Sequence, residues 1–284
     1  MFKKIFFVTA LLLASLLSAK PVVIASIAPV GYLAKAVGGD KIEVQSLAKG
    51  DVHSYEPKPN DMKAVAKARI FIAAGLEFEE AWIPRFKASA KNLVVVKSDA
   101  KIAKLKEERG EQAEHDEKHE AHADPHVWLN PMLAITMARN ISDALIDMDK
   151  ANKDFYLENF QKLMNDLLAF DESAKNELVG LKNRKFVVYH PAWGYFAAHY
   201  DLEQISIERS GKEPKIDEMA STVKMIKDEN IKVIFADPNR SQKSAQILAS
   251  HTGAKVELLD PLGYNLLENL KIAVGAIKDA NSPK

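Results

Sequence analysis

The sequence contains no cysteine among its 284 residues. Disulfide bonds and thiolate metal ligands are therefore excluded, and we expect no membrane attachment through a lipidated cysteine. The chain also has no excess of charge of one sign, because its 39 basic residues balance 39 acidic residues. A nucleic-acid partner would require a basic face, so none is expected.

Long apolar runs are scarce as well, and the longest lies near the amino terminus. Lys3 and Lys4 precede the run IFFVTALLLASLL, and small residues follow up to Ala19. This order is typical of a signal peptide, and the run is short for a membrane span. We expect cleavage after Ala19 and export to the periplasm without a stable membrane anchor. The alternative is an uncleaved anchor.

The rest of the chain alternates short apolar runs, rich in β-branched residues, with segments of helical pattern. This alternation is typical of α/β folds with mostly parallel sheets. The runs form two groups of four, at 21–29, 42–48, 69–75 and 93–100, and at 185–191, 202–208, 231–237 and 254–260. We therefore predict two lobes, each with a mostly parallel four-stranded sheet flanked by helices.

A long helical segment separates the two groups. From Asn152 onward no Gly or Pro occurs before Gly180, and apolar residues recur at spacings of three and four. This recurrence predicts one buried helix face, and about 30 residues would form a rod of about 45 Å. We predict one rigid helix that joins the lobes and limits their motion. The alternative is an ordinary core helix broken in two.

These patterns predict four parts of the chain. They are a signal peptide over residues 1–19, an N-terminal lobe over 20–149, a linking helix over 150–183 and a C-terminal lobe over 184–284. Within the first lobe, residues 101–124 are almost wholly polar. Because such a segment buries little apolar surface, we predict a mobile acidic loop that contains histidines.

Histidine is the residue type that indicates chemistry here. Four of the eight histidines lie in the stretch EHDEKHEAHADPHVWLNP, namely His115, His119, His122 and His126. His119 and His122 are three residues apart, whereas the zinc-protease helix motif has two histidines four apart. The first three histidines lie among acidic residues, so they form either a weak metal site or part of a solvated charged loop.

His126 differs from its three neighbours, because prolines at 125 and 131 restrain the chain around it and apolar residues follow it. A buried imidazole needs partners for both ring nitrogens. From its own surroundings, His126 is therefore either a satisfied core residue or a metal ligand.

Three other residues lie at or just after the expected carboxyl ends of strands. His53 follows the run 42–48, while His190 and Asp260 each end a run directly before a proline. Ligands bind at this edge of open parallel sheets, so these residues and His126 can meet between facing lobes. Three imidazoles and one carboxylate suit tetrahedral Zn²⁺, whereas magnesium, calcium and manganese favour more oxygen ligands.

The oxygen ligand is open at this point, because Asp237 and Glu208 also end strand-like runs. A shell of four protein ligands leaves no open position for water, which argues against metal catalysis. His199 and His251 lie near helix ends, where we expect structural roles.

Four motifs of the chain resemble, in order, those of the cluster A-I metal solute-binding proteins: GDVHSYEPKPND, DPHVWLNP, VYHPAWGYF and LLDPLG. These proteins are the extracytoplasmic receptors of ABC importers for zinc or manganese. The resemblance implies two α/β lobes joined by a rigid helix and one metal between them. The implied ligands are His53, His126, His190 and Asp260. His190 stands where manganese receptors usually have Glu, so the chain looks like the zinc branch.

The resemblance thus implies a periplasmic receptor that binds Zn²⁺ with high affinity and delivers it to an ABC permease. It implies a monomer without enzymatic activity, in which only His126 of its stretch belongs to the main site. The alternatives are a manganese or iron receptor of the same fold and an exported zinc hydrolase. Because protons compete for imidazole, we expect affinity to fall as the pH drops through about 6.

Overall fold

The computed structural model describes residues 20–106, 123–208 and 216–281. The predicted signal peptide lies outside the described residues. So does most of the predicted mobile loop, with His115, His119 and His122.

Two four-stranded sheets form the centres of the two lobes, and every strand pair in them is parallel. The first sheet contains β1 (Val22–Ala25), β2 (Glu43–Ser46), β3 (Ala68–Ala73) and β4 (Val94–Lys97), in the order β2-β1-β3-β4. The second contains β5 (Lys185–Val188), β6 (Glu203–Ser206), β7 (Val233–Ala236) and β8 (Lys255–Leu258), in the equivalent order β6-β5-β7-β8. Each strand overlaps its predicted run, so the predicted fold class is confirmed.

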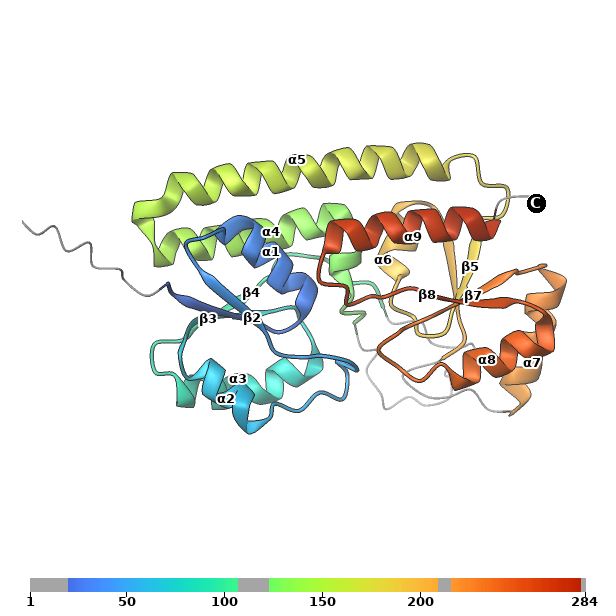
Figure 1. Cartoon of the computed structure of the whole chain (residues 1–284), viewed down its shortest axis with the longest axis horizontal. Coiled ribbons are helices and arrows are strands. Elements are labelled where there is room, and N and C mark those ends of the chain that lie inside the picture. Colours follow the sequence, from blue (N-terminus) through green and yellow to red (C-terminus); the bar gives the residue numbers. More distant parts are fainter. Residues whose placement is uncertain (1–19, 107–122, 209–215, 282–284) are drawn as a thin grey trace, which may run out of the picture.

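Helices cover both faces of each sheet (Figure 1). One side carries α1 (Ala28–Gly38), α4 (Pro131–Met148), α5 (Lys153–Leu178) and α9 (Leu266–Asn281). The other side carries α2 (Pro59–Val65) and α3 (Glu77–Ser89) on the first lobe, and α7 (Ile216–Asp228) and α8 (Lys243–Thr252) on the second. The first layer shares one apolar core with both sheets, whereas the two outer pairs pack on separate cores. A continuous core therefore joins the lobes.

Helix α5 has 26 residues and runs beside both lobes (Figure 1). At about 1.5 Å per residue it is about 39 Å long. Its buried face repeats every three or four residues, as predicted, with Tyr156, Phe160, Leu163, Leu167, Phe170, Ala174 and Leu178. The helix is unbroken, so the linking helix is confirmed and the broken alternative is wrong.

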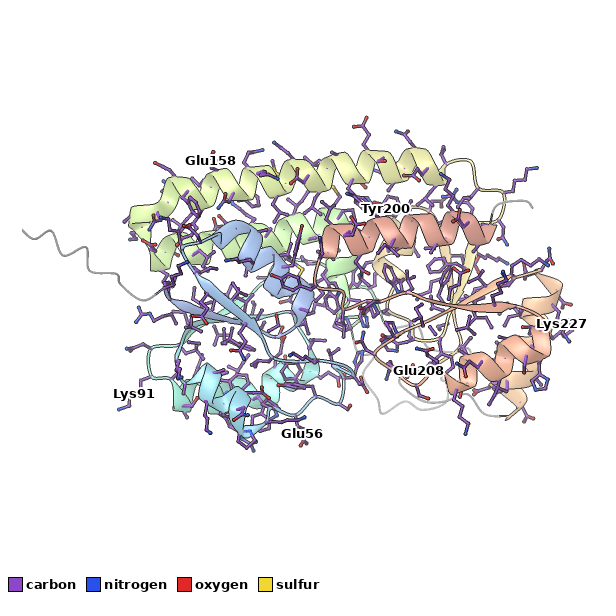
Figure 2. The ribbon with its side chains drawn as sticks, viewed as in Figure 1. Glu56, Lys91, Glu158, Tyr200, Glu208 and Lys227 are labelled. Atoms are coloured by element: carbon purple, nitrogen blue, oxygen red, sulfur yellow. The ribbon has the colours of Figure 1, made fainter. Side chains whose placement is uncertain are left out.

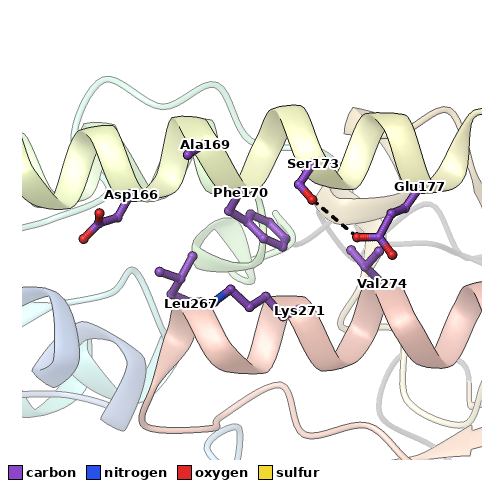
Figure 3. A pocket seen from close by; sticks show the side chains of 8 residues that line it. All are labelled: Asp166, Ala169, Phe170, Ser173, Glu177, Leu267, Lys271 and Val274. Carbon is purple, nitrogen blue, oxygen red and sulfur yellow. Dashed lines mark hydrogen bonds between the residues drawn. The ribbon is translucent and has the colours of Figure 1, made fainter.

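Helix α9 returns from the second lobe and packs along α5, leaving a groove between them (Figure 3). Phe170 and Leu267 line the groove. At its far end the Ser173 hydroxyl donates to Glu177 Oε1 at 3.4 Å, and Lys278 Nζ lies 3.2 Å from Glu177 Oε2. Apolar and ionic contacts thus fasten the last helix to the linking helix.

Charged side chains such as Glu158, Lys91 and Lys227 lie on the outside of the molecule (Figure 2). Within residues 20–106, 123–208 and 216–281, we find no helix with both the length and the apolar character required to cross a membrane.

Candidate metal centre

Three histidines from distant parts of the chain meet between the lobes. His53 lies in the loop after β2, His190 follows β5, and His126 precedes the short 3₁₀ turn η2 (Val127–Leu129). The ring centroids are 5.1 Å apart for His53 and His190, and 5.4 Å for the other two pairs. One nitrogen of each ring lies within 4.8 Å of the others, which suits a shared metal ion. In the described ranges, no other group of three potential ligands is this close.

Asp124 orients His126. Its Oδ1 lies 2.7 Å from His126 Nδ1 and also accepts the His126 backbone N–H at 2.9 Å. The turn that follows is rigid, because the Asn130 side chain caps α4 and the helix begins at Pro131. A neutral His126 that donates Nδ1–H to Asp124 presents the lone pair of Nε2 to the centre. Carboxylates orient ligating histidines in the same way in many metal sites.

Glu208 gives His190 an equivalent partner in the second lobe. Its Oε2 lies 3.0 Å from His190 Nδ1, and both side chains are buried. The Glu208 backbone N–H donates to Tyr189 O at 2.8 Å, which fixes the end of β6 beside the end of β5. With its Nδ1–H donated to Glu208, His190 also presents Nε2 to the centre.

His53 completes the cluster from a loop shaped by Asp51. Asp51 Oδ1 accepts the His53 backbone N–H at 3.2 Å, and Oδ2 accepts the Ser54 hydroxyl at 3.0 Å. The loop turns at Gly50, whose φ of 84° favours glycine. His53 Nε2 is buried and has no hydrogen-bond partner among the described residues. A buried unpaired nitrogen is costly, and a metal ion at the centre of the cluster would satisfy it.

Burial favours the neutral form of His53 and His190. It lowers the pKa of His53 to about 3, with further lowering from the charges that His126 and His190 would carry. Burial also lowers the pKa of His190 well below its ordinary value, followed by the effects of His126 and Arg240. Neutral imidazole is the form that binds metal. For His53 and His190, burial thus favours the ligating form at a lower pH than for free imidazole. The fall in zinc affinity as the pH drops through about 6 stays a prediction.

Asp260 does not belong to the group of close ligand atoms. Its Oδ1 accepts the Asn239 side-chain amide at 2.7 Å and the Leu262 backbone N–H at 2.8 Å. The same strand end still reaches the centre, because Trp128 packs on His126 and its Nε1–H donates to Pro261 O at 2.8 Å. A role for Asp260 as the fourth ligand stays a prediction.

Asp237 and Glu208, the two rival carboxylates, have different surroundings. Asp237 lines a cavity of about 10 Å³ together with the three histidines, Asp51 and Arg240, and burial raises the pKa of Asp237. Such a volume holds about one water-sized sphere. Glu208 instead contacts His190, with its Oε2 3.0 Å from Nδ1. Like Asp260, neither Asp237 nor Glu208 belongs to the group of close ligand atoms, so Asp237 is a lining residue of the cavity and Glu208 a partner of His190.

Two residues at the centre escaped the sequence analysis. Asp124 had a recognisable signal, since it lies two residues before His126 in the same proline-restrained motif. Arg240 had none, because it is one of 39 basic residues and follows Asp237 in a turn. Its Nη1 lies 3.1 Å from Glu208 Oε2 and 2.5 Å from His190 Nδ1.

Comparison with known proteins gives a consistent picture. Residues 23–280 match the family described as "Zinc-uptake complex component A periplasmic". The high-affinity zinc uptake system protein ZnuA of Bacillus subtilis is 30% identical over 279 residues, which cover 91% of this chain and 86% of that protein. A crystal structure of ZnuA superposes with a TM-score of 0.85 at 35% identity, covering 93% of this chain and 100% of that one. A zinc-bound deletion mutant of ZnuA gives a TM-score of 0.86 at 34% identity, covering 93% and 99%.

Proposed function

The chain belongs to the ZnuA family of periplasmic zinc-uptake components, and we propose that it captures Zn²⁺ in the periplasm and delivers it to an ABC permease. The observation that carries this proposal is the convergence of three buried imidazoles, two of them oriented by carboxylates and one with an unpaired Nε2. Zinc is typically bound by such neutral nitrogen ligands with tetrahedral geometry. Zinc here is the cargo.

In this proposal His53, His126 and His190 bind the ion through Nε2. A carboxylate supplies the fourth ligand, with Asp260 as the residue implied by the family resemblance and Asp237 as the residue that lines the cavity. Asp124 and Glu208 hold two of the rings in the ligating orientation. Removal of such supporting carboxylates typically costs about 10–100-fold in metal affinity.

Release of the ion would involve local movement more than wide separation of the lobes. Besides α5, the Tyr195 hydroxyl of α6 (Gly194–His199) bridges the lobes, since it accepts Leu105 N–H and donates to Asp124 O, both at 2.8 Å. The Trp128–Pro261 hydrogen bond is a second bridge. Among the described residues, the loop of His53 meets the second lobe through a longer contact, 3.5 Å between Asp51 Oδ2 and Arg240 Nη2. We therefore propose that this loop moves when zinc leaves.

The proposed receptor is a monomer with no enzymatic activity and no stable membrane anchor. Its parts are an export signal over 1–19, a first lobe over 20–149, a linking helix over 150–183 and a second lobe over 184–284.

Metal analysis and calorimetry test this function. Protein purified without chelator is expected to contain close to one zinc per chain. His126→Ala is expected to abolish tight zinc binding, whereas the exposed His251→Ala serves as the matched control and should bind like wild type. Competition with Mn²⁺ tests whether the site prefers zinc to manganese, because a site with few oxygen ligands favours zinc. Preferential manganese or iron loading, or retention of zinc by His126→Ala, would refute the proposal.

A further inference from the structure

Arg240 lies at the edge of the metal centre, where it contacts groups from both lobes. Its Nη1 is within hydrogen-bonding distance of His190 Nδ1 and Glu208 Oε2, at 2.5 and 3.1 Å. Its Nη2 lies 3.5 Å from Oδ2 of Asp51, which shapes the loop of His53. The side chain is only 18% exposed and lines the same cavity as the three histidines. A permanently charged group is thus built into a site for a cation.

The contact with His190 conflicts with metal ligation. A guanidinium group only donates hydrogen bonds, so a bond from Arg240 requires Nδ1 of His190 to be the acceptor. The proton of a neutral ring is then on Nε2, which blocks that nitrogen as a ligand. Ligation requires the reverse arrangement, with Nδ1–H donated to Glu208 and Nε2 free. One ring cannot satisfy both partners, so Arg240 and the ion compete for His190.

Charge acts in the same direction as the hydrogen bonds. The guanidinium contacts one nitrogen of the His190 ring, and the ion would bind the other nitrogen of the same five-membered ring. Repulsion between two cations at this separation is substantial in a buried site, because water screens it poorly. Glu208 and Asp51 offset part of the charge.

We propose that Arg240 is an intrinsic competitor of the bound ion, which contacts His190 and Glu208 as the ion leaves and moves off His190 as it enters. Arg240 thereby lowers zinc affinity and speeds release, as a receptor that must give up its cargo requires. This inference rests on the proposed function. It assigns a role in release to a residue that binds no metal.

A role as a latch between the lobes is the competing interpretation. It depends on the Asp51 contact, which is long at 3.5 Å and in which Asp51 is 36% exposed. Ion pairs of this kind contribute little. The shorter contacts to His190 and Glu208 are made within the second lobe, so they do not hold the lobes together.

The test compares zinc affinity and release in wild type, Arg240→Met and Lys243→Met. The Met side chain keeps much of the volume of Arg but removes its charge and donors. Lys243 is an exposed cation three residues further on, so its variant controls for the loss of one positive charge. Affinity is measured by competition with a chelating dye, and release by a stopped-flow chase with excess chelator.

Arg240→Met is expected to bind zinc at least tenfold more tightly and to release it correspondingly more slowly, while Lys243→Met stays within twofold of wild type. Arg240→Gln, which keeps an amide donor but no charge, gives the same comparison if the Met variant folds poorly. Thermal unfolding without metal shows which variants fold.

Equal or weaker binding by both Arg240 variants overturns the proposal, as does equal tightening in Lys243→Met. Asp51→Asn distinguishes a latch between the lobes from a competitor of the ion. A latch predicts faster zinc release in both Asp51→Asn and Arg240→Met, whereas the proposal predicts slower release in Arg240→Met. A wild-type protein that does not bind zinc through His126 refutes the proposed function itself, and the inference with it.

Discussion

The first lobe and the second lobe each contribute an imidazole backed by a carboxylate, but the two pairs differ in what else the carboxylate contacts. Asp124 accepts hydrogen bonds from the ring and the backbone of His126 and lies in a proline-restrained turn. Glu208 shares its Oε2 between His190 and Arg240. The first pair is therefore held by two hydrogen bonds to one carboxylate oxygen, whereas the carboxylate oxygen of the second pair is shared with a cation. Under the proposed role of Arg240, the ring of His190 responds to the position of that side chain, whereas the ring of His126 does not.

The largest expected effect comes from removing one ring from either lobe. His126→Ala and His190→Ala should each lower zinc affinity by more than the roughly 100-fold that loss of a supporting carboxylate can cost. Both should also lose the increase in melting temperature that zinc gives by binding only the folded state. Calorimetry and thermal unfolding with and without zinc measure this. His119→Ala, whose residue lies outside the described part, is expected to bind nearly normally, and an equal loss there would mean that the ligands are wrongly assigned.

The next largest effect is a difference in zinc affinity between variants of the two supporting carboxylates, Asp124 and Glu208. Asp124→Asn should weaken zinc binding about 10–100-fold, because it releases the ring of His126. Glu208→Gln should weaken it further, since it also leaves the Arg240 charge uncompensated beside the ion.

A double-mutant cycle sharpens this comparison. Arg240→Met should recover part of the affinity lost in Glu208→Gln but none of that lost in Asp124→Asn. Equal recovery in both backgrounds would mean that the two lobes do not differ as described.

A smaller effect concerns pH. The pKa of His53 is lowered from 6.5 to about 3 in the folded protein, so between these values the unfolded chain binds more protons than the folded chain. The stability of the metal-free protein should be full above the unfolded pKa and should decrease as the pH falls from 6.5 toward 3. Urea unfolding at pH 7, 5.5 and 4.5 measures this decrease. His53→Gln should reduce the slope and the exposed His251→Gln should not; identical slopes would contradict the burial argument.

The smallest effect is expected away from the site. Glu177→Gln removes the contact with Lys278 between α5 and α9, in which both side chains are more than 40% exposed. The free energy of unfolding should change by about 0–1 kcal/mol, and zinc affinity should not change. A clear loss of zinc affinity would show that the packing of α9 on α5 also controls the site. The difference between Asp124 and Glu208 would then not be enough to explain zinc affinity.

Much of the fold was readable from the sequence, because its signals are local. Short apolar runs rich in β-branched residues indicated the strands. The three-and-four spacing of Tyr156, Phe160 and Leu163 indicated the linking helix. The strand ends then indicated His53 and His190, since parallel strands place their carboxyl ends at one edge. His126 was singled out by the prolines around it.

The sequence by itself thus determined the two sheets, the linking helix and the three histidines that meet. Only the tertiary structure decided how His190 is held, since its partner Glu208 follows another strand whose position depends on packing. Spacing could not rank Asp260, Asp237 and Glu208, because all three end strand-like runs. It also could not reveal Arg240, whose contact with Asp51 joins residues 189 positions apart. Side chains that meet across a lobe boundary leave no periodic signal, and their charges act through space rather than along the chain.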